Sequence, residues 1–342
     1  MIFGKKKGFM RIVVDAMGSD NNPEPDVAGA VMAAREFEET IILVGDKAQI
    51  EAELANQDTT GLSLEIVATS QTVTMTDKPS DVVKSKPDSS IHVGMRLVKN
   101  GKADAFVSAG NTGAILAVAM LRQVGLGRIP GVKRPGLGVI FPIKERPFLI
   151  DNGANADCKP EYLLQFGLMG SLYMERMLDI ANPRVGLISN GEEEGKGTTL
   201  IKEAGPLLAA SGLNYIGNIE PKEFMNGAAH VAVADGFSGN LVMKTAEAIA
   251  RYMADALRDE IKSNPVTALG GLLAKPAFGR VRKQLDPHEV GGAPLLGVNG
   301  VVIIGHGRSN AYAIKQAVGQ ARLAVEKNIV EAIAAGIKQE QQ

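Results

Sequence analysis

Residues 105–113 read AFVSAGNTG, so a short apolar run is followed at once by a cluster of Ser, Gly, Asn and Thr. The run predicts a buried strand, and the cluster predicts a turn into a helix. Similar clusters stand at 151–155 (DNGAN), 190–197 (NGEEEGKG) and 235–240 (DGFSGN). The second and fourth follow apolar runs directly, and Ser189 interrupts the run before the third. Strands that alternate in this way with helical patterns predict a mostly parallel sheet covered by helices on both faces.

The same patterns give the expected organisation of the whole chain. Strands are predicted at 12–15, 41–44, 64–67, 105–107, 138–140, 148–151, 184–188, 215–217, 231–234 and 301–304. Helices are predicted at 26–38, 89–99, 112–121, 161–178, 198–210 and 241–262, and a long one at 309–335. Residues 1–10 are expected to be a disordered tail. Residues 11–335 are expected to form a single large three-layer α/β/α catalytic domain, with an irregular apolar and basic insertion at about 241–297.

Composition narrows the function classes. The 342 residues carry a net charge of −1, which gives no indication of nucleic-acid binding. A single cysteine, Cys158, excludes an intrachain disulfide and makes a cysteine-based metal site unexpected. No stretch approaches the roughly 20 uncharged residues that span a bilayer, and Lys5–Lys7 are not followed by the apolar region of a secretory signal. A cytoplasmic protein is therefore expected.

The clusters predict an anion site. Glycine lets the backbone approach an anion closely, and a helix that starts there directs free N–H groups at it. Ligands of α/β sheets bind at the carboxyl ends of the strands, where all four clusters are expected. We therefore expect one composite site for an oxyanion, most simply phosphate. Its expected contacts are Asp15, Gly18, Ser108, Gly110, Thr112, Gly113, Gly195, Gly197, Asp235, Gly239 and Asn240.

Four further residues are expected to carry chemistry, each with an alternative. Thr112 can cap the helix while Asn111 projects into the cleft, although a ligand-free turn would use the same residues. Asn155 is a candidate amide donor to a carbonyl or a phosphate. Lys196 stands between glycines in a setting that suits phosphate but lacks the Walker spacing, and it also fits a solvated loop. His306 can act as a general acid, contact an anion or cap a helix.

Several common chemistries have no sequence signal. No serine sits in a nucleophile elbow, no histidine pair has zinc spacing, and no Gly-x-Gly-x-x-Gly follows the first strand. Cys158 is expected to be a bystander, because only Lys159 and a helix start would lower its pKa. No cofactor or metal is expected. Phosphate itself could then be the nucleophile.

The ordered motifs resemble a known family. They are Asp-Ala-Met-Gly-x-Asp from Asp15, Ser-Ala-Gly-Asn-Thr-Gly-Ala at 108–114, Asp-x-Gly-Ala-Asn at 151–155, Lys-Pro-Glu at 159–161, and the stretches 190–197, 217–220, 235–240, 291–297 and 306–307. Together they are similar to the bacterial phosphate acyltransferase (PlsX) family over residues 11 to about 327. The departures are small: Ser19 stands where the family usually has a second glycine, and Ser189-Asn190-Gly191 replaces Asn-Ile/Val-Gly.

The resemblance implies transfer of a fatty acyl group from acyl carrier protein to orthophosphate, giving acyl phosphate for glycerol-3-phosphate acylation in phospholipid synthesis. It also implies a homodimer, a fold similar to phosphotransacetylases and isocitrate-type dehydrogenases, and peripheral contact with the membrane or the downstream membrane acyltransferase. In this hypothesis Lys196 and the 108–113 loop hold phosphate, and Asn111 and Asn155 donate to the thioester oxygen. His306 assists charge or proton balance at the leaving thiolate, while Asp235 and Asn240 shape the pocket.

The expected insertion has an apolar tip, with Leu272 and Leu273 in it, followed by basic residues. This combination suits an anionic bilayer or an acidic carrier protein. The amphipathic helix before it, at 241–262, better suits a dimer interface. Three other functions compete with the implied one: a phosphotransacetylase that uses acyl-CoA, a silent scaffold that docks carrier protein at the membrane, and a dehydrogenase.

Overall fold

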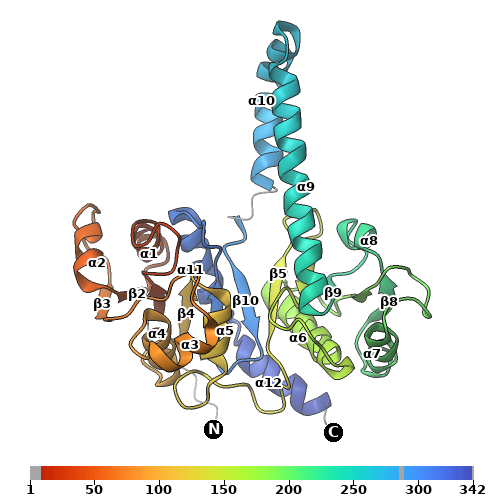
Figure 1. Ribbon diagram of the computed structural model, residues 1–342, viewed down its shortest axis with the longest axis horizontal. Helices are drawn as coiled ribbons and strands as arrows, with labels where there is room; N and C mark the ends of the chain where they lie inside the picture. Colours follow the sequence, from red (N-terminus) through yellow and green to blue (C-terminus); the bar gives the residue numbers. More distant parts are fainter. Residues whose placement is uncertain (1–8, 285–288, 341–342) are drawn as a thin grey trace.

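A computed structural model describes residues 9–284 and 289–340, and most of the expected tail lies outside these ranges. One sheet of eleven strands runs through the molecule in the order β3-β2-β1-β4-β11-β10-β5-β6-β9-β7-β8 (Figure 1). The strands are β1 (Arg11–Asp15), β2 (Thr40–Gly45), β3 (Leu64–Ala68), β4 (Ala105–Ser108), β5 (Gly136–Ile140), β6 (Phe148–Ile150), β7 (Val185–Ile188), β8 (Tyr215–Ile219), β9 (Val231–Val233), β10 (Ala293–Leu296) and β11 (Val301–Ile304). The mostly parallel sheet predicted from the sequence is confirmed.

The sheet consists of two parallel sets. Strands β3, β2, β1, β4 and β11 form one set, and β6, β9, β7 and β8 form the other. Between them β10 pairs antiparallel to both β11 and β5, and β5 pairs antiparallel to β6. The two sets therefore run in opposite directions along the hydrogen-bonded sheet, and their carboxyl ends do not share one edge.

Helices cover both faces of the sheet. They are α1 (Glu24–Phe37), α2 (Lys47–Leu54), α3 (Pro79–Ser85), α4 (Ser90–Lys99), α5 (Thr112–Met120), α6 (Pro160–Leu178), α7 (Thr199–Ala210), α8 (Pro221–Met225), α9 (Gly236–Lys262), α10 (Pro265–Gln284), α11 (Ala311–Glu326) and α12 (Ile329–Glu340). Because strand side chains alternate between faces, Ile12 and Val14 join one core while Val13 joins another.

The core is continuous on one face and divided on the other. On the first face α1, α11, α12, α6 and α7 share a single apolar cluster that spans both strand sets. On the second face α3, α4 and α5 pack over one set, while α8 and the base of α9 pack over the other. Ala154, in the loop after β6, packs against the α4–α5 core. Each parallel strand set forms one lobe together with its helices, and the two lobes therefore meet on this second face.

Helices α9 and α10 project from the sheet as a long hairpin (Figure 1). The insertion at about 241–297 was expected to be irregular, which is wrong for Pro265–Gln284, a helix despite Pro276 inside it, while residues 285–288 lie outside the described ranges. Helix α9 also begins earlier than predicted, at Gly236, so the 235–240 cluster forms its cap and first turn. The Gly and Pro residues of α10 lowered the helix propensity of the sequence. Helices α9 and α10 nevertheless pack against each other, and this packing stabilises both.

Two further predictions are wrong at the carboxyl end of the chain. The single helix expected at 309–335 is divided into α11 and α12, because Asn328 adopts a left-handed φ of 52°. Strand β10 was not predicted for two reasons. Its four residues, APLL, are too few to show an alternating pattern, and the second of them is a proline, which is uncommon inside a sheet.

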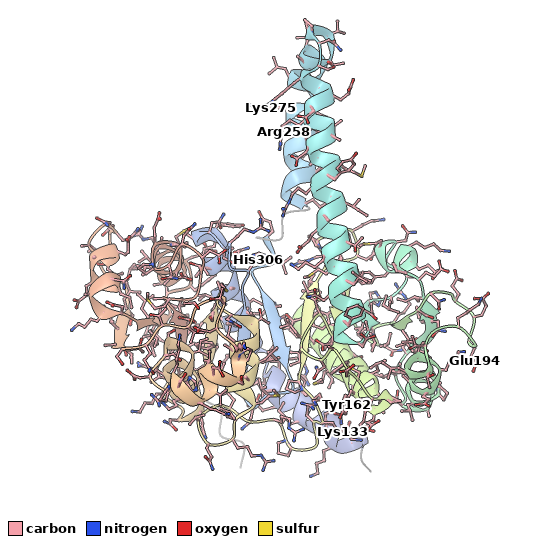
Figure 2. All side chains as sticks on the ribbon, in the orientation of Figure 1. Lys133, Tyr162, Glu194, Arg258, Lys275 and His306 are labelled. Carbon is pink, nitrogen blue, oxygen red and sulfur yellow. The ribbon has the colours of Figure 1, made fainter. Side chains whose placement is uncertain are left out.

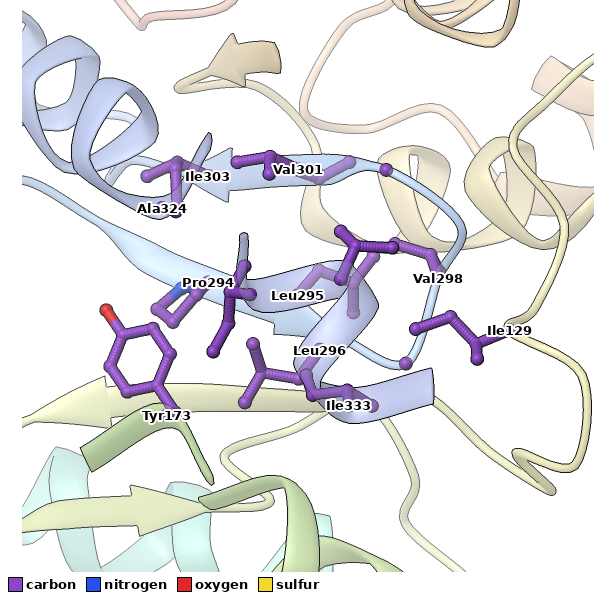
Figure 3. Close-up of a pocket in the computed structure, with 15 residues that line it drawn as sticks. Ile129, Tyr173, Pro294, Leu295, Leu296, Val298, Val301, Ile303, Ala324 and Ile333 are labelled. Carbon is purple, nitrogen blue, oxygen red and sulfur yellow. The ribbon is translucent and has the colours of Figure 1, made fainter. Parts of the chain in front are cut away.

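An apolar cavity lies between β10, β11, α12 and Tyr173 (Figure 3). Its volume is about 10 Å³, close to that of one water-sized sphere, and its lining is almost entirely aliphatic. A crevice of this size and polarity is a packing gap in the core and does not hold a substrate. Within residues 9–284 and 289–340, no helix is both long and apolar enough to cross a bilayer.

Candidate active site

A buried hydrogen bond links the loops that follow β1 and β4. The buried carboxylate of Asp15 accepts hydrogen bonds from Ser108 Oγ at 2.7 Å and from the Met17 N–H at 3.0 Å. Ser108 Oγ in turn accepts from the Gly110 N–H at 3.1 Å. A Cβ on Gly18 would lie 3.0 Å from the Gly110 nitrogen, so the two loops need glycine where they meet. Asp15 and Ser108 thus position the loops from inside and do not reach a substrate directly.

Asn111 has a different role from the predicted one. Its Oδ1 accepts from the Ala114 N–H at 3.0 Å, so Asn111 caps α5 and Thr112 is the first helical residue, the reverse of the prediction. Its Nδ2 donates to carbonyl oxygens of Thr74, Met75 and Asp77 at 2.9–3.2 Å. Because these bonds occupy the amide, the expected donation to a thioester oxygen is not available in this arrangement. Gly113, beside the cap, faces Pro79.

Asp151 organises the loop after β6. Its buried carboxylate accepts from the backbone N–H groups of Leu137, Ala154 and Asn155 at 2.7–3.1 Å. The Asn155 side chain donates to Asp151 at 2.9 Å and to the Pro135 carbonyl at 2.7 Å, so its donors are also occupied and the predicted thioester contact is not supported. Burial raises the pKa of Asp151 although these hydrogen bonds oppose the shift.

The base of α9 closes over the Asp151 loop. Asp235 caps the helix, because its carboxylate accepts from the Ser238 N–H and hydroxyl, each at 2.8 Å. A Cβ on Gly239 would lie 2.0 Å from the Asp151 carbonyl oxygen, so only glycine permits this approach. Asn240 Nδ2 donates to the Asn152 carbonyl at 3.4 Å. These predicted pocket residues therefore serve mainly to fix where α9 starts.

The imidazole of His306 lies between the two lobes, below the α9–α10 hairpin (Figure 2). Its Nδ1 accepts from the Arg308 N–H at 3.1 Å, which leaves the proton of the neutral ring on Nε2. Partial burial and the positive charges of Lys244 and Arg308 lower the pKa of His306, so the ring is neutral at pH 7. Asn310, and not His306, caps α11. His306 therefore offers an N–H donor near Lys244 and Arg308, whose effect on its pKa outweighs the opposing effect of Glu247 and Asp20.

This cationic group joins the lobes. Lys244 stands on α9 and pairs with Glu247 at 3.3 Å, whereas His306 and Arg308 follow β11. The sequence singled out His306 but did not assign Lys244 or Arg308 to the site. Their convergence depends on the direction in which α9 leaves β9, which no local motif specifies. Two cations and a neutral imidazole N–H are suitable ligands for a phosphate dianion.

Lys196 is outside this group, so the expectation that all four clusters form one site within a chain is wrong. The 190–197 loop follows β7, five strand positions from β11, or roughly 24 Å at the usual strand spacing. Glu194 in the same loop lies at the far side of the molecule from His306 (Figure 2). Gly195 and Lys196 are exposed there, and Gly197 has a left-handed φ of 92°.

Cys158 is not suited to be the nucleophile of this site. Burial, followed by nearby carboxylates, raises the pKa of Cys158 to about 12, so its thiol stays protonated and is a poor nucleophile. The described part of the chain contains no cluster of three or more His, Cys, Asp or Glu side chains suited to a metal ion.

Proteins of known name resemble this chain over nearly its whole length. The sequence model of a family described as "Fatty acid synthesis protein" matches residues 10–332. A phosphate acyltransferase of Syntrophotalea carbinolica is 47% identical over 96% of this chain and 94% of its own. One from Alkaliphilus oremlandii is 46% identical over 96% and 97%. The chain belongs to the phosphate acyltransferase family. Its members carry the name of a transferase, and the matches extend over nearly the whole chain.

Solved structures of other proteins share the fold of this phosphate acyltransferase family member. A phosphotransacetylase from Streptococcus pyogenes superposes with a TM-score of 0.57 at 18% identity, covering 95% of this chain and 94% of the other. A putative 4-hydroxythreonine-4-phosphate dehydrogenase from Salmonella typhimurium gives 0.51 at 9% identity, covering 92% and 99%. At these identities the likeness concerns the fold, and it confirms the fold predicted from the family resemblance.

Asp26 is a buried acid that sequence reasoning did not single out. Its carboxylate accepts from Ser19 Oγ at 2.5 Å, and its Oδ1 is buried without a hydrogen-bond partner. Burial raises the pKa of Asp26 to about 7, from 3.8. Because the native state favours the protonated acid, the stabilisation is fully present below pH 4 and is lost as the pH rises through 7.

We expect Asp26→Asn to remove this loss. The wild-type free energy of unfolding should fall by up to about 4 kcal/mol more than that of the variant between pH 4 and pH 8. Urea denaturation at several pH values measures the difference. Val27→Ala, a buried neighbour without a titratable group, should lower stability by the same amount at every pH. Equal pH dependence in the wild type and Asp26→Asn would contradict the assignment.

Proposed function

We propose that this chain transfers a fatty acyl group from acyl carrier protein to orthophosphate, within one catalytic domain at residues 11–335. The product, an acyl phosphate, would supply glycerol-3-phosphate acylation in phospholipid synthesis. The observation that carries the proposal is that His306, on the loop after β11, lies within electrostatic range of Arg308 on its own loop and of Lys244 on α9 of the other lobe. Membership of a family named for acyl transfer to phosphate supports the same reaction.

The chemistry needs an anion holder and a proton donor. Phosphate held by Lys244 and Arg308 attacks the thioester carbonyl, and a C–O bond forms as the carbonyl becomes a tetrahedral oxyanion. The oxyanion collapses, the C–S bond breaks, and the carrier thiolate leaves. The Nε2–H of His306 can donate to the developing oxyanion or to the thiolate. No enzyme nucleophile takes part, in keeping with the protonated Cys158.

The donor distinguishes the proposal from its main competitor. Acyl carrier protein and acyl-CoA present the same phosphopantetheine thioester, so the site residues do not separate them. We expect phosphate-dependent release of free carrier protein from a long-chain acyl carrier protein, with acyl phosphate as product, and little turnover of acyl-CoA. A preference for acyl-CoA would instead indicate a phosphotransacetylase. Failure of both donors would favour a scaffold, and nicotinamide-dependent turnover a dehydrogenase.

The hairpin tip supports a further part of the proposal, namely a cytoplasmic protein that associates peripherally with the membrane. Val266, Leu269, Leu272 and Leu273 are exposed near the turn between α9 and α10, and Lys275 and Arg280 follow them. Apolar side chains beside cations suit an anionic bilayer, where a downstream membrane acyltransferase would receive acyl phosphate.

We expect Leu272→Glu combined with Leu273→Glu to abolish flotation with anionic vesicles, because two charges would enter the headgroup boundary. Activity on soluble acyl carrier protein should be retained, since the tip is far from His306 along the hairpin (Figure 2). The charge-matched control is Lys222→Glu on α8, which is exposed away from the tip. Undiminished flotation of the double variant would exclude the tip as the membrane contact.

The hairpin stem supports a homodimer. Ile249, Tyr252, Met253 and Leu257 are large, exposed apolar side chains on α9. An unpaired apolar stripe of this length is typical of an interface between copies of a chain. Sedimentation of the wild type as a monomer would contradict this part of the proposal.

A further inference from the structure

A turn at Thr74–Asp77 lies against the loop that carries His306. If Gly307 carried a Cβ, that atom would lie 2.9 Å from Met75 Cε and 2.7 Å from Asp20 Oδ1. Gly307 immediately follows His306, so the methyl group of Met75 is next to the candidate catalytic loop. Nevertheless Met75 is 44% exposed as a residue, with Thr74 and Thr76 exposed on either side of it. An apolar side chain therefore reaches solvent beside the site.

The turn is held rigidly. Asn111 Nδ2 donates to the carbonyl oxygens of Thr74, Met75 and Asp77. The Asp77 carboxylate accepts from the Thr74 N–H at 2.7 Å and from Lys86 Nζ at 2.6 Å. The ion pair to Lys86 lowers the pKa of Asp77, so the carboxylate is charged over the working range. A turn fixed in this way holds the backbone of Met75 in place, so only its side chain has to be ordered when a ligand binds.

The geometry explains what Asn111 does. Because its amide is committed to the turn and to the α5 cap, Asn111 fixes the backbone that carries Met75 and has no donor left for a substrate. It is thus a positioning residue, and its removal should change the binding of whatever contacts the turn.

We propose that the Thr74–Asp77 turn recognises the acyl part of the thioester and that Met75 contacts the acyl chain. This inference rests on the proposed function. A thioester whose carbonyl lies within reach of His306 must direct its first carbons and its pantetheine arm across the surfaces next to that loop. The arm is polar, with amides along it, whereas the acyl chain is apolar. Methionine is flexible and polarisable, which suits an apolar chain of variable length.

The test is a chain-length series with acyl carrier protein as the constant carrier. For Met75→Ala we expect kcat/KM to fall about tenfold with a long acyl chain and less than twofold with a short one, because the lost contact is apolar. Met75→Leu should restore most of the loss. Met225→Ala, a partly exposed methionine on α8 in the other lobe, is the matched control and should behave as the wild type.

Asn111→Ala adds a readout that a catalytic donor would not give. As a positioning residue it should raise the KM for the long-chain thioester while kcat and the phosphate KM stay near wild type. A fall in kcat at saturating thioester, with KM unchanged, would overturn the positioning role. A Met75→Ala loss that is equal at all chain lengths, or absent, would overturn the acyl contact. Both results require an active wild type, whereas an inactive wild type refutes the proposed function itself.

Discussion

The buried carboxylate of Asp151 is the constraint on which the arrangement of the site depends. It accepts four hydrogen bonds, from the Leu137, Ala154 and Asn155 backbone and from the Asn155 side chain. These bonds link β5, the end of β6 and the loop that follows. Helix α9 then starts directly against this loop, since Gly239 leaves no gap for a side chain over the Asp151 carbonyl. The direction of α9 decides where Lys244 lies.

Charges of both signs surround His306: Lys244 and Arg308 lower its pKa, while Glu247, which pairs with Lys244, and Asp20 oppose the shift. The acids beneath the β1 loop are buried, and desolvation raises the pKa of both Asp15 and Asp26, which disfavours negative charge under the loops. His306 is kept neutral by its surroundings, and Lys244 and Arg308 supply the positive charge. A neutral imidazole with its proton on Nε2 can donate without adding a third cation. This arrangement suits a reaction in which the nucleophile is itself an anion.

The sequence predicted most strands and most helices, because each short β-branched run ended in turn residues and each longer run had a helical period. It predicted β5 as a strand, but it did not predict β10 or the antiparallel pairing of the two at the centre of the sheet. For that reason it placed four loops at one edge, although the loops after β6, β7 and β9 follow strands that run opposite to β4.

The site residues were predicted less well than the fold, for a related reason. Gly/Asn clusters mark strand ends reliably, but Asn111, Asn155 and Asp235 use their polar groups to cap helices and fix loops. Of the two cations near His306, Arg308 lies in the same loop, whereas Lys244 comes from a position with no motif. Lys244 is one of many helical lysines in the sequence, and only the direction of α9 brings it to the other lobe.

The central claim is that phosphate binds between the lobes at Lys244, His306 and Arg308. Titration calorimetry of inorganic phosphate into the wild type, Lys244→Ala and Lys196→Ala tests it most directly. Loss of a charge-assisted hydrogen bond predicts that Lys244→Ala weakens phosphate binding by roughly tenfold or more, while Lys196→Ala binds as the wild type does. Weakened binding in Lys196→Ala together with unchanged binding in Lys244→Ala would contradict the account.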